Sequence, residues 1–202
     1  MSLKYRNICG VILAGGKATR YKGQDKAFLK INQETFYKKA SALLSAIFED
    51  VIVITNKPAD FPDDSISKFP DLIKEIGPLG GIHSALTHAP HCEAVFVMAV
   101  DMPFISESII RQICDTYISS QKDIVVPLIK KDIEPLAAVY SKSILIKLTE
   151  TITQTKKYSI RNFFNLVDTY YCPLDLHPHT VKSFANINSE SDYQKHIMNN
   201  ED

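Results

Sequence analysis

The most constraining feature of the sequence is an apolar run, Ile8–Leu13, that leads directly into a loop with two adjacent glycines, Gly15 and Gly16. A short β-branched run of this kind is typical of a buried parallel strand. Two glycines at its end allow the backbone to take positive φ and to approach a ligand closely. The pair of features predicts a binding loop at the carboxyl end of the first strand.

Four cations follow the glycines within ten residues, namely Lys17, Arg20, Lys22 and Lys26. Backbone amides and cations together suit a polyphosphate. The loop has neither the Gly-Lys-Ser/Thr of a Walker loop nor the G-x-G-x-x-G of the dinucleotide fingerprint. The alternative is a glycine-containing strand-to-helix turn with a solvated basic face, and Lys17 and Lys22 fit that description best. The pattern indicates a phosphate loop outside the two commonest classes.

Helical and apolar patterns alternate along the rest of the chain. We expect helices over residues 35–48, from the 75–82 glycine turn to about 87, and over 106–117, 143–155 and 158–165, with a last polar helix capped by Ser189. We expect strands over residues 50–56, 94–100, 123–127, 135–140 and 166–171, and an irregular segment over 58–70. The alternation predicts one domain, residues 1–202, with three α/β/α layers around a mostly parallel sheet.

Composition limits the classes of partner and compartment. The formal net charge is zero and 23% of residues are charged, which predicts no global attraction to nucleic acid or to an anionic membrane. No apolar run approaches the roughly 18 residues of a membrane span, and the apolar run near the N-terminus is too short for a signal peptide. The four scattered cysteines include no C-x-x-C pair, so we expect no disulfides and a reducing cytoplasm.

Two carboxylates stand where open α/β sheets bind ligands. Asp101 follows the 94–100 strand and precedes Pro103, and one strand-end carboxylate can hold Mg²⁺ when a triphosphate supplies other oxygens. Asp71 could accept hydrogen bonds from guanine or from ribose hydroxyls. The plain alternatives are a turn or N-cap aspartate and a solvated loop acid. The His88-x-x-His91-Cys92 motif fits a polar loop better than a metal site, because the sequence has no second pair of ligands to complete a tetrahedral metal coordination.

Two motifs in this loop resemble the signature loop of nucleotidyltransferases: Leu-Ala-Gly-Gly-x-x-x-Arg, which ends at Arg20, and Gly-x-Asp-Lys, which ends at Lys26. More narrowly, they resemble the molybdenum cofactor guanylyltransferases. The resemblance continues in order through the whole chain with Asp71, Gly77-Pro78-Leu79, Asp101-Met102-Pro103, Glu134-Pro135-Leu136 and Asn186-Ile187-Asn188.

This resemblance implies a Rossmann-like nucleotidyltransferase fold. It also implies an enzyme that transfers GMP from MgGTP to the phosphate of Mo-molybdopterin and releases pyrophosphate. The implied catalytic residues are Arg20, Lys26 and Asp101, with Asp101 as the Mg²⁺ ligand. The implied GTP-binding residues are Leu13, Ala14, Gly15, Gly16, Lys26, Asp71, Pro78, Leu79 and Asp101. Weaker matches on the side of the second substrate are Glu134, Arg161, Asn186 and Asn188.

Two positions depart from the family pattern and keep alternatives open. Lys22 stands before Gly23 where small residues are frequent, and Ile54 stands where some relatives carry a polar residue that faces the base. The alternatives are a cytidylyltransferase on the same pterin, a sugar or alditol phosphate nucleotidyltransferase, and a nucleotide-binding module without turnover. We expect a monomer, whose further partners would be cofactor-synthesis proteins and molybdoenzyme chaperones.

Overall fold

The structure is a computed structural model that describes residues 3–15, 20–21, 24–62, 65–89, 91–154, 159–185, 187 and 192. Its strands are β1 (Ile8–Leu13), β2 (Arg20–Tyr21), β3 (Gln24–Asp25), β4 (Lys30–Ile31), β5 (Glu34–Thr35), β6 (Val51–Ile54), β7 (Ser67–Phe69), β8 (Ala94–Ala99), β9 (Ile124–Ile129), β10 (Asp132–Ile133), β11 (Ala137–Ser141) and β12 (Thr169–Pro173). Its α-helices are α1 (Phe36–Ile47), α2 (Pro78–His88), α3 (Glu107–Ser120), α4 (Leu145–Gln154), α5 (Ile160–Phe164) and α6 (Pro178–Ser183). Short 3₁₀ turns are η2 (Lys26–Phe28), η3 (Pro58–Asp60) and η4 (Lys142–Ile144).

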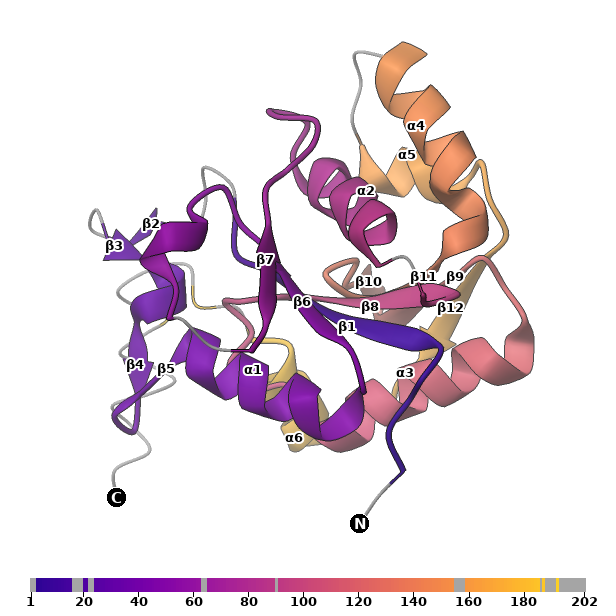
Figure 1. Ribbon diagram of the computed structural model, residues 1–202. Coiled ribbons are helices and arrows are strands. Elements are labelled where there is room, and N and C mark those ends of the chain that lie inside the picture. The colour runs from indigo at the N-terminus through magenta and orange to yellow at the C-terminus, as the bar shows by residue number, and fades with distance from the viewer. Residues whose placement is uncertain are drawn as a thin grey trace.

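Within these residues one sheet of eight strands organises the fold, in the order β10-β9-β11-β8-β1-β6-β7, with β12 paired to β9 (Figure 1). β8, β1, β6 and β7 are parallel neighbours. β11 runs antiparallel to both β8 and β9, and β10 is antiparallel to β9. The mostly parallel sheet predicted from the sequence is therefore confirmed, with β11 as its central antiparallel exception.

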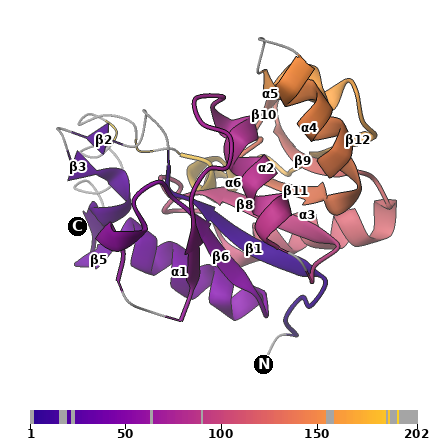
Figure 2. The same ribbon diagram turned by 45° about the horizontal axis from the view of Figure 1, so that its top comes forward.

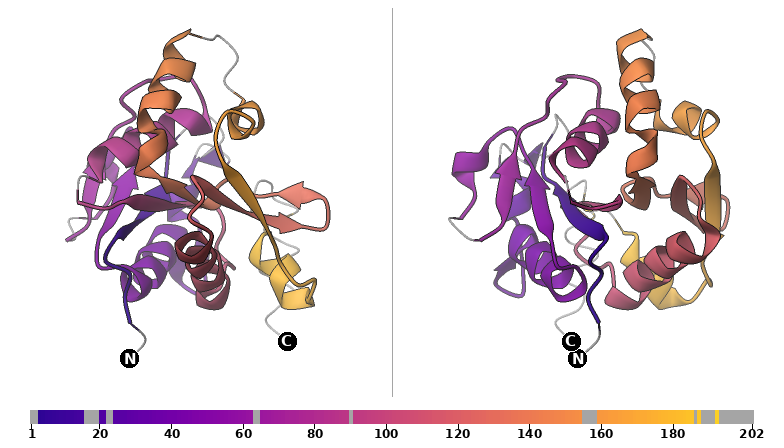
Figure 3. Two further views of the ribbon diagram at one scale, coloured as in Figure 1. Left: turned by 90° about the vertical axis from the view of Figure 1, so that its right-hand side faces the viewer. Right: turned by 45° about the vertical axis from the view of Figure 1, so that its right-hand side comes forward.

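Helices cover both faces of the sheet, which gives the three predicted layers. α1, α3 and α6 lie on one side and α2, α4 and α5 on the other, as the two views of Figure 3 show. Each layer closes over its own apolar core: one core contains Leu44, Ile110 and Phe96, and the other contains Leu86, Leu148 and Val97. Successive β8 residues supply the two cores alternately, as the period of a strand requires.

The predicted helix over 35–48 shows why the local assignments succeed. The Thr35 hydroxyl accepts a hydrogen bond from the Lys38 amide at 3.1 Å and caps α1. The apolar side chains spaced along its inner face are buried, from Phe36 through Leu44 to Ile47. Ser106 occupies the N-cap position of α3 as predicted, but its hydroxyl contacts the Ser108 hydroxyl instead of a backbone amide.

Several elements differ from the sequence-based prediction. Residues 58–70 are not irregular throughout, because Ser67–Phe69 forms the edge strand β7 beside β6. The strand expected over 166–171 begins later and is β12, Thr169–Pro173. The helix α6, Pro178–Ser183, was not predicted, while Thr155, Tyr158 and the helix cap at Ser189 lie outside the described residues. Short polar edge strands carry little hydrophobic periodicity, which explains why sequence patterns miss them.

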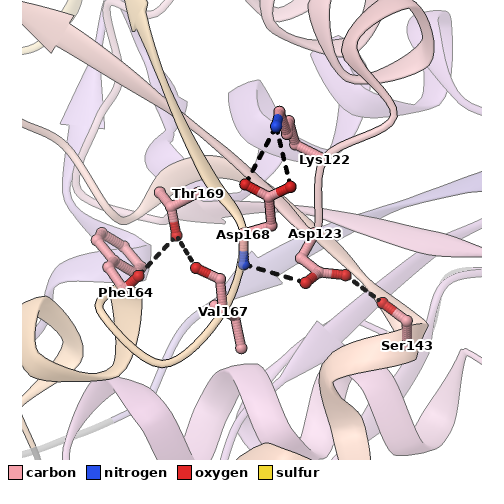
Figure 4. A network of polar contacts seen from close by, with 7 residues as sticks. All are labelled: Lys122, Asp123, Ser143, Phe164, Val167, Asp168 and Thr169. Carbon is pink, nitrogen blue, oxygen red and sulfur yellow. Dashed lines mark hydrogen bonds and ion pairs between the residues drawn. The ribbon is translucent and has the colours of Figure 1, made fainter.

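A polar network fixes the start of β12 against β9 (Figure 4). Lys122 donates to both carboxylate oxygens of Asp168, at 2.9 and 3.2 Å. One Asp123 oxygen accepts from the Asp168 amide at 3.1 Å, and the other accepts from the Ser143 hydroxyl at 2.7 Å. Asp123 therefore joins the beginnings of β9, β12 and η4. Because these three segments are far apart in the sequence, no local sequence pattern predicts the contacts between them.

Gly10 lies in β1 where α1 crosses the sheet, and it offers a direct test of this packing. A Cβ atom at Gly10 would lie 2.7 Å from Cδ2 of Phe48, whose ring stacks on Phe96 with centroids 5.7 Å apart. Because this aromatic pair cannot move aside easily, we expect Gly10→Ala to lower the free energy of unfolding by about 1–3 kcal/mol. Urea denaturation measures the change.

Gly15→Ala is the matched control for that substitution. Among the described residues, the nearest atom to a Cβ there would be Asp71 Oδ2 at 3.7 Å, an ordinary van der Waals contact. We therefore expect its stability to remain within about 0.5 kcal/mol of wild type. Equal urea midpoints for the two variants would contradict the close packing at Gly10.

The four cysteines are buried and free, in agreement with the sequence-based expectation. Cys9 lies in β1 and Cys114 in α3, both within the apolar cores. Burial raises the pKa of the Cys114 thiol well above its ordinary value. Every helix in the described ranges is too short or too polar to span a bilayer.

Candidate active site

A cleft of about 920 Å³ opens at the carboxyl ends of β1, β6 and β8. Its floor continues the three strands, since the Ala14 amide donates to the Ile54 carbonyl at 2.9 Å and the Val100 amide to the Leu13 carbonyl at 3.1 Å. The cleft is lined by Leu13, Ala14, Gly15, Asp25, Ile54, Thr55, Asn56, Lys57, Asp71, Ile73, Lys74, Glu75, Gly77, Pro78, Gly81, Ala99, Val100, Asp101 and Leu136. It lies where ligands bind in open α/β sheets.

Asp101 lines the cleft and forms an ion pair with Lys26, whose buried side chain is not itself among the lining residues. Lys26 Nζ lies 2.9 Å from Asp101 Oδ2, and the two residues are 75 positions apart in the sequence. The Lys26 side chain is only 2% exposed and that of Asp101 is 20% exposed. A charge buried to this extent needs a partner, and Asp101 supplies one. Lys26 is therefore not an exposed surface charge.

Asp25 instead positions Lys26. Its carboxylate accepts a hydrogen bond from the Ala27 amide at 3.0 Å and caps the 3₁₀ turn η2 that begins at Lys26. The backbone of Arg20 pairs with that of Asp25, which lines the cleft, in the two-residue ladder of β2 and β3 (Figure 2). Gly16, Lys17 and Lys22 lie outside the described residues.

Asp71 lies on the opposite wall, near the first glycine loop and α2. Its Oδ2 would be 3.7 Å from a Cβ atom at Gly15, and its Oδ1 would be 3.8 Å from a Cβ atom at Gly81. Asn56 Nδ2 donates to Asp71 Oδ2 at 2.8 Å, and the Asp71 amide donates to Asn56 Oδ1 at 3.2 Å. The two glycines leave open space around the carboxylate that side chains would narrow.

The second glycine turn begins α2 and forms part of the same wall. Gly77 has a φ of 66°, and Pro78 follows at the first position of the helix, where its ring is tolerated. Pro78 lines the cleft, whereas Leu79 is 1% exposed and packs in the core. Gly80 allows α2 to lie close to the preceding segment, because a Cβ atom there would be 2.8 Å from the Ile73 carbonyl oxygen.

The candidate residues for the second substrate fall in different places. The Ile187 amide donates to the Asp101 carbonyl at 3.1 Å, which places Ile187 beside Asp101, whereas Asn186 and Asn188 lie outside the described residues. Glu134 does not line the cleft, but Glu134 Oε1 accepts from the amide of Leu136, which does. Arg161 is exposed on α5 and is not among the lining residues.

Sequence reasoning missed several polar residues of the cleft, namely Thr55, Asn56, Lys57, Lys74 and Glu75. Asn56 and Lys57 directly follow β6, so the strand-end rule that identified Asp101 could also have found them. Lys74 lies in the turn between Asp71 and α2, where no pattern separates a cleft residue from a solvated one.

The His88-x-x-His91-Cys92 motif begins at the last residue of α2, where His88 packs against an aromatic ring. The His88 ring stacks on Phe69 with centroids 4.2 Å apart, and burial lowers the pKa of His88 below its ordinary value. In the part of the chain that the structure describes, no three His, Cys, Asp or Glu side chains are grouped to hold a metal ion. A metal at the cleft would thus need oxygens from its ligand besides Asp101.

Comparison with known proteins agrees with this geometry. Residues 10–169 match the MobA-like NTP transferase domain. The chain is 33% identical over 189 residues to a probable molybdenum cofactor guanylyltransferase of Pelotomaculum thermopropionicum, covering 92% of this chain and 90% of that protein. It is 30% identical over 194 residues to a protein of the same name from Clostridium perfringens, covering 94% and 96%.

Solved structures show the same fold. The crystal structure of molybdopterin-guanine dinucleotide biosynthesis protein A from Archaeoglobus fulgidus superimposes with a TM-score of 0.79 at 23% identity, covering 94% of this chain and 97% of that one. A 4-diphosphocytidyl-2C-methyl-D-erythritol synthase from Anaerococcus prevotii gives a TM-score of 0.70 at 12% identity, covering 96% of each chain. The same fold thus occurs in one protein whose name refers to a guanine dinucleotide and in another whose name refers to a cytidyl compound.

Proposed function

Because the chain belongs to the MobA-like NTP transferase family and is therefore a nucleotidyltransferase, we propose that it transfers GMP from GTP to the phosphate of Mo-molybdopterin. The observation that carries the proposal is the buried Lys26–Asp101 pair in a cleft whose opposite wall presents Asp71. The products of the proposed reaction are molybdopterin guanine dinucleotide and pyrophosphate.

The charges of the cleft orient the nucleotide. The buried cation at Lys26, with Arg20 from the first loop, attracts the triphosphate to that end. The Asp71 carboxylate would repel phosphate, but it accepts hydrogen bonds from a base or a ribose. GTP therefore lies with its phosphates towards Lys26 and its nucleoside towards Asp71, between Leu13, Gly15 and Pro78.

In the proposed reaction an oxygen of the pterin phosphate forms a bond to the α-phosphorus of GTP. The bond from that phosphorus to the bridging oxygen breaks in line, and its electron pair leaves with pyrophosphate. Lys26 and Arg20 stabilise the charge that builds on the phosphate oxygens, which is the main protein contribution to nucleotidyl transfer. The family resemblance assigns the backbone amides of Gly15 and Gly16 to the same oxygens.

The cleft fits Mg²⁺ as the divalent metal. Asp101 offers a hard carboxylate oxygen at the strand end, and Mg²⁺ is held well by one or two carboxylates, substrate phosphates and water. When bound, the metal would neutralise charge on the triphosphate. Glu134 is assigned to the pterin side because it holds the amide of Leu136, which lines the cleft, while the assignment of Asn186, Asn188 and Arg161 to that side rests on the family resemblance.

The first test is a calorimetric titration with GTP, CTP, ATP and UTP, each with Mg²⁺. We expect GTP to bind at least tenfold more tightly than the other three, because only guanine offers paired N–H donors to Asp71. A preference for CTP would replace the proposal with a cytidylyltransferase, an alternative that the apolar Ile54 in the cleft wall keeps relevant.

Release of pyrophosphate on addition of Mo-molybdopterin then separates the enzyme from a nucleotide-binding module without turnover. Size-exclusion chromatography coupled to light scattering tests the expected monomer. The buried free thiols fit the reducing cytoplasm, which we propose as the compartment.

A further inference from the structure

Asn56 and Asp71 are joined by two hydrogen bonds that run in opposite directions. Asn56 Nδ2 donates to Asp71 Oδ2 at 2.8 Å, and the Asp71 amide donates to Asn56 Oδ1 at 3.2 Å. Both residues line the cleft. We propose that Asn56 is a positioning residue that fixes the Asp71 carboxylate for recognition of the nucleoside of GTP, an inference that rests on the proposed function.

The local structure explains why Asp71 needs such a partner. Asp71 lies between the end of β7 at Phe69 and the start of α2 at Pro78, in a segment without a helix or strand. The next residue is anchored separately, because the Leu72 amide donates to the buried Ser84 hydroxyl at 2.8 Å. That contact holds the main chain of the segment, whereas the bond from Asn56 Nδ2 sets the direction of the Asp71 carboxylate.

Asn56 is placed for this task by the sheet. It lies two residues beyond the end of β6, and the Thr55 amide before it donates to the Phe69 carbonyl at 2.8 Å. The β6–β7 pairing therefore carries both partners of the contact to the same edge. With Oδ2 held by Asn56, Asp71 presents Oδ1 towards Gly81 and the space beside Leu13, on the nucleoside side of the cleft.

An amide suits this position better than a carboxylate, and that difference supplies the test. In Asn56→Asp, two carboxylates would face each other, and such a pair raises the pKa of one member. At a pH below that raised pKa, the proton shared by the two carboxyl groups makes the hydrogen bond that the Asn56 amide makes in wild type. Above it, the proton is lost and the two charges repel, so Asp71 turns away and GTP binding weakens.

The experiment measures the dissociation constant for MgGTP by calorimetry at pH 5 and pH 8 for wild type, Asn56→Asp and Asn56→Ala. The ratio of variant to wild type at each pH removes the titration of GTP itself. For Asn56→Asp we expect this ratio of dissociation constants to be close to one at pH 5 and at least ten at pH 8. A factor of ten corresponds to the loss of a hydrogen bond to a charged group. The Asn56→Ala ratio should be about tenfold at both pH values.

Tripolyphosphate with Mg²⁺ distinguishes positioning from a general collapse of the cleft. This probe occupies only the phosphate end, so its affinity should stay within twofold of wild type in both variants. The exposed Asn162 on α5 gives the control Asn162→Asp, which adds the same charge elsewhere and should leave both affinities unchanged. Equal losses for GTP and tripolyphosphate, or a pH-independent Asn56→Asp ratio, would overturn the inference.

A measurement without nucleotide separates this inference from the proposed function. The coupling between the two side chains can be seen in NMR spectra, because the side-chain amide protons of Asn56 should shift between wild type and Asp71→Asn, which lacks the accepting carboxylate. If wild type prefers a nucleotide other than GTP, the proposed function fails while this coupling still tests the contact. Absence of the coupling would overturn the positioning role even if GTP binds.

Discussion

We expect replacement of Lys26 by methionine to lower kcat/KM for GTP by about a thousandfold, roughly 4 kcal/mol of transition-state stabilisation. The reason is the position of the ammonium group, which is buried beside Asp101 at the end of the cleft assigned to the triphosphate. A buried cation is screened little by water, so its effect on developing phosphate charge is large. Steady-state assays of pyrophosphate release give the value.

Methionine is the informative substitution because Lys26 is 1% exposed. Lys26→Ala should also abolish turnover, but it would leave a cavity, so loss of activity could follow from loss of structure. Methionine retains the length and most of the apolar packing of the side chain. The circular dichroism spectrum of Lys26→Met should match that of wild type. Its melting temperature should be lower, because Asp101 loses its ion-pair partner.

Lys131→Met is the matched control, since Lys131 is exposed beside β10 and does not line the cleft. It removes the same charge and should leave kcat/KM within about twofold, as expected for a surface substitution. Wild-type turnover in Lys26→Met would remove Lys26 from the catalytic residues.

The sequence predicted the strand-end part of the site well and the side-chain contacts poorly. Leu13, Ala14 and Asp101 each follow an apolar run, and the ends of parallel strands meet at one edge of a sheet. The partner of Lys26 could not be predicted in this way. Asp25 is adjacent in sequence, whereas Asp101 is brought near only when β8 pairs beside β1.

The same distinction applies to the fold. Long elements such as α1 and β8 carry a full period of buried residues and were predicted almost to their ends. The edge strand β7 has three residues in the order Ser-Lys-Phe, with no alternation long enough to detect. Its importance is nevertheless high, because it carries Asp71 to the cleft and into contact with Asn56.

The second large effect concerns Asp101. We expect Asp101→Asn to lower kcat by at least a thousandfold, with no recovery at high Mg²⁺, because an amide lacks the charge that a divalent cation needs. Asp101→Ala should do the same but would also remove the carboxylate that pairs with the buried Lys26, and removing one member of a buried pair is strongly destabilising. Asparagine retains the shape and an acceptor oxygen for Lys26.

Asp132→Asn is the control, since Asp132 is exposed on β10 and the neutralised charge is the same. The decisive comparison is a Mg²⁺ titration of turnover in the three proteins. If Asp101 holds the metal, wild type and Asp132→Asn should saturate at the same Mg²⁺ concentration, and Asp101→Asn should show no saturable activity. If Asp101 served only to neutralise Lys26, Asp101→Asn would keep a normal Mg²⁺ dependence and lose mainly stability. Activity and stability measured together on one variant therefore separate the two roles of this carboxylate.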